Sequence, residues 1–503
     1  MDEGRVEVAL PVPFQAPFTY RMPAGAPVPQ RGVRVQVPFG GRRMIGVVTG
    51  PAGEAEGTAL QLKEVLHVLD EAPLVEPPLL DLAAWMADHY LAPPGECYRA
   101  VLPPAGVRSS RAVVRLAKAA GSDPEDRVLR ELVAGPLRLT TLARRLGSDP
   151  EARVARLRRK GLVEVEQDIG APGFREVAVA VLLDDAAEPK GRAQAEVLER
   201  LRAKGGRARV ADLVRDRPSL RGAVSRLAEK GVVRLDEERD VRSPAGLPAR
   251  DAAPLEPTSD QEAALGPLLE ALGERSFRPF LLHGVTGSGK TEVYFRAVES
   301  CLAASRGAIL LVPEIALTPM LVRAARSRFG STVSVLHSEL SAGERHDQWW
   351  RLREGEARVA VGARSAVFAP VPDLGLVVVD EEHDGSYKQD ESPRYPGRDV
   401  AVMRARLEGC PVVLGSATPS VESHANALRG KYERLLLPTR IGPRGLPRVE
   451  IVDRREVLRG GGDPILSPAL RDALAACLAR REQSLLLLNR RGYATSLLCR
   501  ECG

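Results

Sequence analysis

The stretch PFLLHGVTGSGKT, residues 279–291, decides the fold of the larger part of this chain. An apolar segment runs into the pattern G-x-x-x-x-G-K-[ST] from Gly284 to Thr291, and the helical pattern TEVYFRAVES follows at once. A strand, a glycine-rich loop and a helix in that order form a phosphate-binding loop. Its glycines let backbone amides turn toward phosphate oxygens, Lys290 reaches the β and γ oxygens, and the Thr291 hydroxyl ligates magnesium. We therefore expect a nucleoside triphosphate site here.

Five further apolar runs between residues 307 and 420 repeat this design. They are GAILLVPEIALTP, VSVLHS, ARVAVGARSAV, LGLVVVDEEH and CPVVLGSATPS, and each precedes a polar loop and a helical pattern. Buried strands that alternate with helices predict a parallel sheet covered on both faces, with the functional residues at the carboxyl ends of the strands. We assign this α/β domain to residues 251–440.

The run LGLVVVDEEHD ends a predicted buried strand on acidic residues. Burying a charged carboxylate at such a position costs free energy unless it binds a cation. We interpret Asp380 as the magnesium ligand and Glu381 as the base that positions the attacking water. His383 is predicted either to couple the site to neighbouring motifs or to cap the strand.

The sequence GSATP at residues 415–419 follows another buried run. Small hydroxyl side chains at this position, Ser416 and Thr418, can sense the state of the γ-phosphate and pass it to the nucleic-acid side.

Composition sets the wider limits. A chain of 503 residues has room for three or four domains, and a net charge of +6 favours polyanionic partners. Of the six cysteines, only Cys499 and Cys502 have a spacing, C-x-x-C, that suggests a shared function. This argues against a disulfide framework. No signal segment and no run of about 18 apolar residues is present, so we expect a soluble protein of the cytoplasm with no membrane contact.

Two regions precede the α/β domain. Residues 5–50 read as short alternating strands, and a helical stretch closes this β-rich domain, which we assign to residues 1–106. Residues 107–250 contain an internal repeat, in which the segment from Val128 resembles that from Val197. Each copy reads as three helices and then a β-hairpin, the order of a winged helix. Contact with DNA and a purely structural spacer remain equally open for both copies.

The segment DGSYKQDESPRYPGRD directly follows the acidic strand end. Aromatic and cationic side chains of this kind stack on bases and grip single-strand phosphates. We therefore predict DNA contacts from Tyr387, Lys388, Tyr395 and Arg398, and the alternative is a polar loop whose tyrosines pack on the adjacent helix. Arg364 of the GARSAV motif is a further candidate for DNA contact and for coupling.

The phosphate loop, DEEH and GSATP in this order resemble superfamily 2 helicases, whose motor has two RecA-like lobes with ATP between them. The stretch VVVDEEHDGSYKQDESPRYPGRDVAVMRA narrows the resemblance to the PriA family of replication restart helicases, and LHSELSAGER, LGSATPSVES and LLLLNRRGYATSLLCRECG are similar to that family's motifs. The resemblance covers nearly the whole chain and implies an α/β multidomain protein. It implies an ATP- and Mg²⁺-dependent 3′ to 5′ DNA helicase that recognises stalled or abandoned forks and initiates primosome assembly.

The same resemblance implies partners and site residues. The expected partners are branched DNA forks, single-stranded DNA, primosome proteins and single-strand-binding protein, which suggests a nucleoid-associated location. The nucleotide and magnesium site is expected to comprise Gly284, Gly287, Gly289, Lys290, Thr291, Asp380 and Gln261.

The N-terminal segments VALPVPFQAPFTYRMP and VRVQVPFG resemble the family's domain that binds the 3′ end of a nascent strand. Carried over by motif, Phe18 offers an aromatic face for the base, Gly40 allows close backbone approach, and Lys63 supplies a cation for phosphate. Thr19 stands where the family commonly has an acidic residue, which puts carboxylate recognition of the 3′-hydroxyl in question.

Cys499 and Cys502 resemble the first half of the family's zinc module, and structural zinc needs four ligands. We interpret residues 441–503 as the start of a second motor lobe followed by this cysteine pair. The chain is accordingly expected to be truncated, with Zn²⁺ held only in the complete protein and little ATP turnover from these residues alone.

Two alternatives stay open. One is another superfamily 2 DNA translocase of the RecQ or RecG kind, against which SYKQ and the FTYRMP/VPFG domain argue. The other is a non-catalytic platform that binds forks and loads the primosome. The intact Gly289, Lys290 and Thr291, together with the acidic pair, favour catalysis.

Overall fold

The chain divides into a larger unit, residues 1–441, and a smaller one, residues 442–503. A computed structural model describes residues 4–53, 62–103, 111–117, 127–133, 135–146, 150–168, 175–183, 189–240, 256–313, 319–442, 448–453, 455 and 466–487. In the smaller unit the described helix is α16 (Pro468–Ala479), whose first turn is capped by the Ser467 hydroxyl.

The N-terminal domain is an antiparallel sheet with strand order β2-β1-β4-β3-β5. Its strands are β1 (Arg5–Ala9), β2 (Phe18–Arg21), β3 (Arg34–Phe39), β4 (Arg42–Pro51) and β5 (His67–Val68). The segment before β5 also pairs with β2 through a bridge between Arg21 and Glu64, so it joins the two ends of the sheet. The predicted β-rich domain is thus confirmed, and the curvature brings β2 and β3 side chains together.

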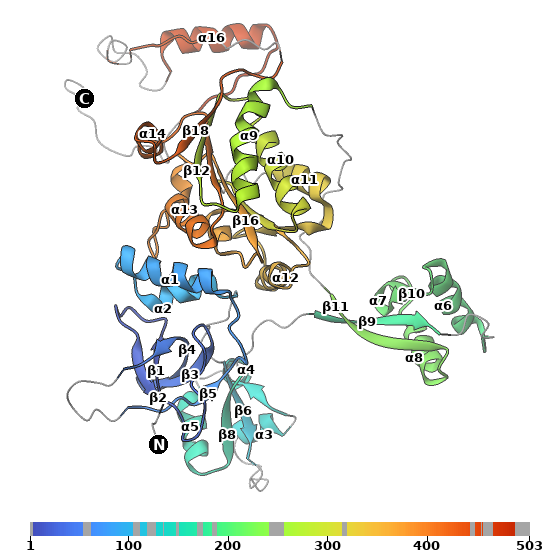
Figure 1. The fold of residues 1–503 in the computed structure, drawn as a ribbon. Coiled ribbons are helices and arrows are strands. Elements are labelled where there is room, and N and C mark those ends of the chain that lie inside the picture. The colour runs from blue at the N-terminus through green and yellow to red at the C-terminus, as the bar shows by residue number, and fades with distance from the viewer. Residues whose placement is uncertain are drawn as a thin grey trace. The chain divides into compact units, whose positions relative to one another are not determined.

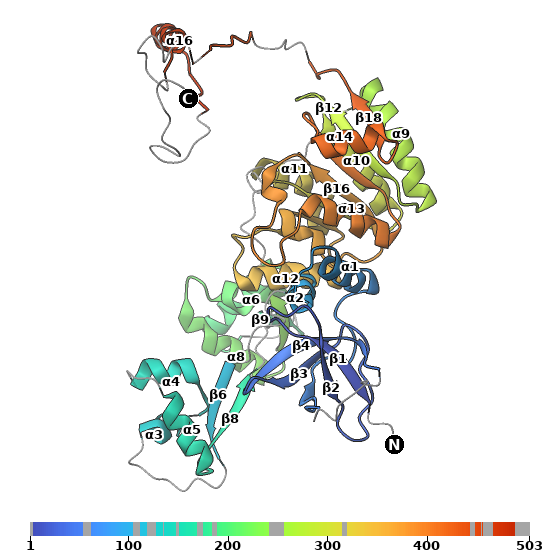
Figure 2. The ribbon, with the colours of Figure 1, turned by 90° about the vertical axis from the view of Figure 1, so that its left-hand side faces the viewer.

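Helices α1 (Pro77–His89) and α2 (Pro94–Val101) follow this sheet, close to where the sequence predicts a helix. The buried face of α1, which includes Leu79, Leu82 and Met86, joins one continuous core with α13 (Gly397–Glu408) of the α/β domain. Figure 2 shows α1 beside α13. Arg353 adds a polar link, since its Nε donates to the carbonyl of Leu74 at 2.7 Å.

The two repeats share one topology, each with a three-stranded sheet. The first contains β6 (Arg111–Leu116), α3 (Arg127–Leu132), β7 (Leu137–Arg138), α4 (Leu139–Leu146), α5 (Glu151–Arg159) and β8 (Val163–Asp168). The second contains β9 (Arg175–Leu182), α6 (Arg192–Ala203), β10 (Arg207–Arg209), α7 (Val210–Leu213), η1 (Pro218–Leu220), α8 (Arg221–Glu229) and β11 (Val233–Asp240).

The hairpin predicted after the third helix of each repeat is wrong. The strand that follows the third helix pairs instead with the strand that precedes the first, β8 with β6 and β11 with β9. Each three-helix cluster is therefore closed by a pairing between the two ends of its repeat, and the local KG turn signal does not encode that long-range partner.

The α/β domain is built on a seven-stranded sheet with order β14-β15-β13-β16-β17-β12-β18, and the pairings are parallel. Its strands are β12 (Pro279–Gly284), β13 (Gly307–Leu311), β14 (Val333–Leu336), β15 (Val359–Gly362), β16 (Leu374–Asp380), β17 (Val412–Ser416) and β18 (Glu433–Leu437). The six predicted strands are confirmed. β18 was not predicted, because its apolar run is only three leucines long and follows two charged residues.

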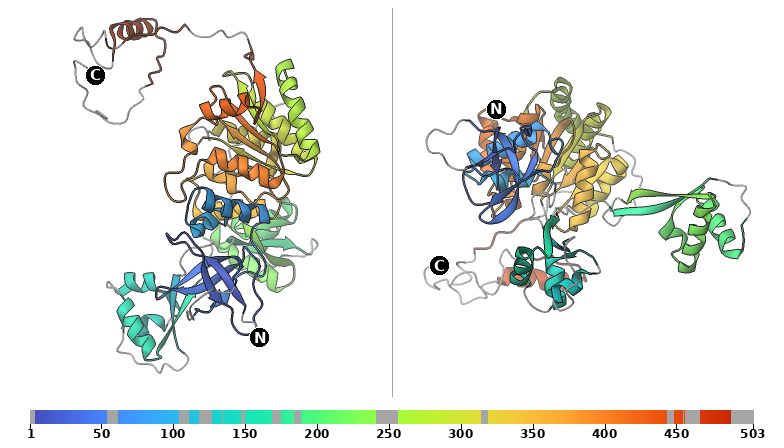
Figure 3. Two further views of the ribbon diagram at one scale, coloured as in Figure 1. Left: turned by 60° about the vertical axis from the view of Figure 1, so that its left-hand side comes forward. Right: turned by 90° about the horizontal axis from the view of Figure 1, so that it is seen from below.

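Alternate residues of these strands feed two cores. Phe280 and Leu282 of β12 face a core shared with α9 (Ser259–Glu274), α10 (Lys290–Ala303) and α11 (Pro319–Phe329). Leu281 faces the other core, which includes residues of α12 (Ala342–Arg353) and α13. Helices therefore cover both faces of the sheet (Figures 1 and 3), as predicted.

Candidate active site and nucleic-acid interface

The phosphate loop connects β12 to α10, and its glycines are required by geometry. Gly287 and Gly289 both have φ of 82°, a left-handed conformation that side chains with a Cβ adopt only with strain. A Cβ at Gly289 would also lie 2.2 Å from Nε2 of Gln261. The predicted loop therefore needs glycine at these two positions, and Lys290 is the first residue of the helix that follows it.

Lys290 lies where the loop meets the acidic strand end. Its side chain is 10% exposed, its Nζ donates to the carbonyl of Gly284 at 3.1 Å, and Oε1 of Glu381 is 3.9 Å away. Within the described part of the chain, the buried Ser288 hydroxyl has no hydrogen-bond partner. A buried cation and an unpaired hydroxyl at a glycine-rich helix N-terminus suit a triphosphate, so these residues fit the predicted ligand.

Gln261 supports the loop from the preceding helix. The side chain is buried, and its amide donates to the carbonyls of Ser288 at 3.1 Å and Gly289 at 3.4 Å. Its carbonyl oxygen accepts from the backbone of Thr258, which completes a capping box at the start of α9. Gln261 therefore touches the predicted nucleotide site through the loop backbone.

Asp380 ends β16 and is held by two tyrosines. The hydroxyl of Tyr294, on α10, donates to its Oδ1 at 3.0 Å, and the hydroxyl of Tyr387 donates to its backbone carbonyl at 2.6 Å. Burial raises the pKa of the Asp380 carboxyl, and the charge of Glu381 raises it further, while the bond from Tyr294 opposes both effects.

The two glutamates that follow Asp380 point to opposite sides. Glu381 has φ of 45°, an unfavourable conformation for a residue with a Cβ, and this turn presents its carboxylate to Lys290. The Glu382 backbone amide then bonds the carbonyl of Gly415 at 3.0 Å, and its carboxylate is fully buried. The DEEH motif thus supplies one acid to the predicted nucleotide site and one to the interior.

The buried Glu382 is the centre of a network that the sequence did not reveal. It accepts from the Ser420 backbone at 2.7 Å, the Ser423 hydroxyl at 2.8 Å and Arg398 Nη1 at 3.1 Å. Ser420 caps α14 (Val421–Leu428), and Arg398 also donates to the Ser420 hydroxyl at 2.8 Å. The network joins the acidic strand end, α13 and α14. In the sequence, the S-x-x-S spacing of Ser420 and Ser423, typical of a helix cap, could have indicated part of it.

The three predicted coupling residues meet at the ends of β16 and β17. His383 Nδ1 is 2.8 Å from the Ser416 hydroxyl, and its Nε2 is 3.4 Å from the Thr418 hydroxyl. The Thr418 backbone amide donates to the Ser416 hydroxyl at 2.9 Å. Oε2 of Glu381 is 3.7 Å from Nδ1 of His383, so the cluster adjoins the nucleotide site.

The loop after DEEH departs from its predicted role in one respect. Tyr387 and Tyr395 are only 3% and 4% exposed, and the Tyr395 ring packs against Phe368 with centroids 5.4 Å apart. The structure therefore contradicts base stacking by these tyrosines, and the alternative of internal packing holds for both. Burial in the apolar core raises the pKa of Tyr395 to about 12.

The cations of this loop are placed differently from one another. Arg364 donates to the carbonyl of Ser386 at 2.9 Å and also to that of Lys388, so it fixes the loop backbone. Arg398 is engaged with Glu382 and Asp399, whereas the Lys388 side chain is exposed. Of the predicted DNA contacts in this segment, Lys388 is the one that faces solvent freely.

The N-terminal domain gathers aromatic side chains where β2 begins and β3 ends. The rings of Phe18 and Phe39 are 4.9 Å apart, and Phe14, which is largely exposed, lies 5.6 Å from Phe18. Gly40 follows Phe39 and has φ of 54° in the turn to β4. Phe18 and Gly40 are thus brought to one end of the sheet.

Thr19 and Lys63 lie on and beside the same strand. Thr19 is half-buried in β2, and the exposed Lys63 lies alongside, with its carbonyl accepting from the Arg21 backbone at 3.0 Å.

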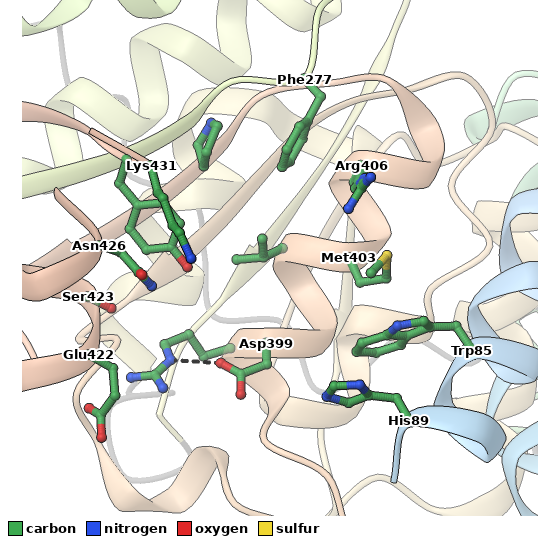
Figure 4. A pocket seen from close by; sticks show the side chains of 14 residues that line it. Trp85, His89, Phe277, Asp399, Met403, Arg406, Glu422, Ser423, Asn426 and Lys431 are labelled. Atoms are coloured by element: carbon green, nitrogen blue, oxygen red, sulfur yellow. Dashed lines mark hydrogen bonds and ion pairs between the residues drawn. The ribbon is translucent and has the colours of Figure 1, made fainter. Parts of the chain in front are cut away.

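A cavity of 490 Å³ lies between α1, α13 and α14 (Figure 4). The labelled side chains show Trp85 and His89 of α1 facing Asp399 and Met403 of α13, with Ser423 and Asn426 of α14 across the opening. Arg398 lines this cavity as well, so it connects the opening with the Glu382 network.

Two further predictions concern the zinc ligands and contact with a membrane. Cys499 and Cys502 lie outside the described residues, and within the described ranges no cluster of three or more potential metal ligands occurs. No helix in the described parts of the chain is long and apolar enough to cross a lipid bilayer.

Comparison with known proteins agrees with this arrangement. Residues 7–103 match the 3′DNA-binding domain (3′BD) of PriA, and residues 258–427 match the DEAD/DEAH box helicase family. The phosphate loop, the acidic strand end and the sheet topology define a RecA-like helicase lobe, which follows the domain that matches the 3′DNA-binding model. Over nearly its whole length the chain is similar to replication restart proteins named PriA.

Two relatives illustrate the extent of the match. The replication restart protein PriA of Bacillus subtilis is 37% identical over 97% of this chain and 62% of its own length. The corresponding protein of Synechocystis is 35% identical over 97% of this chain and 61% of its own length. The chain therefore spans less than two thirds of these relatives.

A solved structure of RecG bound to a three-way DNA junction overlaps 38% of this chain and 25% of that chain, with 23% identity and a TM-score of 0.30. An overlap of this size does not bear on function.

Proposed function

We propose that this protein is an ATP-dependent 3′ to 5′ DNA helicase that recognises stalled or abandoned replication forks and initiates primosome assembly. The observation that supports the catalytic part best is the approach of Lys290 to Glu381 at 3.9 Å across a phosphate loop of the required geometry. The relatives are named as replication restart proteins, and the 3′ DNA-binding match supports recognition of a strand end.

Each residue of the site has a separate role in ATP hydrolysis. Lys290 and the loop amides stabilise charge on the phosphates, and Thr291 and Asp380 would hold Mg²⁺, which supplies further charge stabilisation when bound. Glu381 is partly exposed beside Lys290, where it can orient a water molecule and accept its proton.

Three sets of hydrogen bonds connect this site with the loop after DEEH and with the ends of β17 and α13. His383 joins Glu381 to Ser416 and Thr418, Tyr387 bonds the Asp380 carbonyl, and Glu382 reaches Arg398. We propose that a strand bound near Lys388 shifts the loop, and that these bonds carry the shift to the two catalytic carboxylates.

Zinc forms a separate part of the proposal. The thiolates of Cys499 and Cys502 would supply two of the four ligands that a structural zinc site needs.

The function is tested by strand separation on a synthetic fork with the full-length protein. We expect ATP- and Mg²⁺-dependent displacement with 3′ to 5′ polarity, together with preference for a fork that carries a nascent 3′ end. Displacement with the same polarity but no preference for that end would favour a general superfamily 2 translocase. Fork binding without displacement would favour a non-catalytic loading platform.

Phe18→Ala is expected to weaken binding to a fork with a free 3′ end by about tenfold, because stacking on an aromatic ring contributes ~1–3 kcal/mol per base. Fluorescence anisotropy with a labelled fork measures this affinity. The control is the same fork with its 3′ end closed in a hairpin, which should bind wild type and variant alike.

Phe14→Ala separates two arrangements of the aromatic cluster. If affinity falls for Phe14→Ala and stays unchanged for Phe18→Ala, the more exposed ring is the platform and the role assigned to Phe18 is wrong.

A further inference from the structure

Tyr294 lies one helical turn after Lys290, on the same face of α10. Its side chain is 1% exposed, and the ring belongs to the core between α9, α10 and the sheet. A buried phenol hydroxyl is costly unless it is hydrogen-bonded, and here it donates to Oδ1 of Asp380 at 3.0 Å. The apolar ring therefore delivers one donor to the carboxylate that ends β16.

Gly415 makes room for that hydroxyl. A Cβ at this position would lie 1.6 Å from the Tyr294 hydroxyl oxygen and 2.8 Å from the ring carbon that bears it. Gly415 is also the residue that pairs with Asp380 between β17 and β16. The phenol thus occupies the space above Gly415, directly beside the carboxylate, and glycine is required there by space.

We propose that Tyr294 is a positioning residue for magnesium binding. Its bond to Oδ1 fixes the rotamer of Asp380, the carboxylate that would hold the cation, as partners of metal ligands commonly do. This role rests on the proposed function, since it presupposes that Asp380 holds Mg²⁺.

Tyr387 provides a matched contrast at the same residue. It is also buried and also donates through its hydroxyl, but to the backbone carbonyl of Asp380 at 2.6 Å. Loss of that hydroxyl leaves the bond from Tyr294 to the carboxylate in place. Tyrosine-to-phenylalanine changes at the two positions therefore separate an effect on the carboxylate from a general effect of a missing buried hydroxyl.

The experiment measures Mg²⁺-dependent binding of a fluorescent, non-hydrolysable ATP analogue to the full-length protein. Tyr294→Phe should raise the Mg²⁺ concentration for half-maximal binding by about tenfold, the loss typical of removing a partner of a metal ligand. With no DNA present to shift the loop, Tyr387→Phe should leave that concentration at the wild-type value, because the bond from Tyr294 to Oδ1 is intact. Thermal unfolding of each variant, measured in parallel, confirms that it is folded.

Gly415→Ala gives a second, independent arm, because its methyl group displaces the Tyr294 hydroxyl. It should reproduce the Tyr294→Phe shift, and the double variant should shift no further than either single variant. An unchanged Mg²⁺ requirement in folded Tyr294→Phe, or an equal shift in Tyr387→Phe, overturns the inference. A wild-type protein that binds the analogue without any need for Mg²⁺ would instead contradict the proposed function.

Discussion

Lys290→Ala is expected to lower ATP hydrolysis by about 10³-fold or more, because charge stabilisation of the transferred phosphoryl group is the main catalytic contribution in such sites. The lysine is buried between the Gly284 carbonyl and Glu381, so its charge lies directly at the loop. Fork binding should persist, since the aromatic cluster around Phe18 belongs to a separate sheet. Phosphate release and fluorescence anisotropy on the same preparations measure the two activities.

Glu381→Gln is the matched control for this prediction. It keeps the shape of the side chain and removes the proton acceptor, so it should abolish turnover while nucleotide binding continues. Lys290→Ala should lose both. If Lys290→Ala loses fork affinity as severely as ATP hydrolysis, the assignment of DNA-end binding and catalysis to separate domains is wrong.

The α/β domain could be predicted because its signals are local. Each of the strands β12 to β17 is a short apolar run between polar loops, and Gly287, Gly289 and Lys290 stand in a spacing that the phosphate loop requires. The same holds for Asp380 and Glu381, since acids at the end of a buried strand have few other uses.

Other features could not be predicted, because they depend on partners far away in the sequence. The direction of Glu382 follows from the left-handed turn at Glu381, and Tyr294 reaches Asp380 only because Gly415 lies in register beside it. The pairing of β8 with β6 is equally distant from the turn that suggested a hairpin.

In the loop after DEEH, residue types alone led to a wrong prediction of base stacking. Tyr387 and Tyr395 are of the residue type that stacks on bases, yet both rings are buried in the protein. Aromatic side chains serve cores and nucleic acids alike, so residue type alone did not decide between the two.

Arg398→Ala is expected to destabilise the protein by about 3 kcal/mol, because removal of one partner leaves the fully buried Glu382 carboxylate without its cation. The matched control is Arg394→Ala in the same loop. Arg394 is exposed and bonds only the Asp390 carbonyl, at 2.9 Å, among the interactions described, so its loss should cost less than about 0.5 kcal/mol. Urea denaturation of the full-length protein measures both.

Arg398→Ala should also remove the stimulation of ATP hydrolysis by single-stranded DNA, because Arg398 links α13 to both Glu382 and Ser420. Loss of stability and loss of coupling are separated by Arg398→Ala combined with Glu382→Gln. A neutral amide is cheaper to bury than an unpaired carboxylate, so this pair should regain part of the stability. Its stimulation should stay lost, since the link from α13 to the acidic strand end is still missing. If stimulation persists at the wild-type ratio, the network is purely structural, and coupling must pass through Arg364, which holds the loop carbonyls of Ser386 and Lys388.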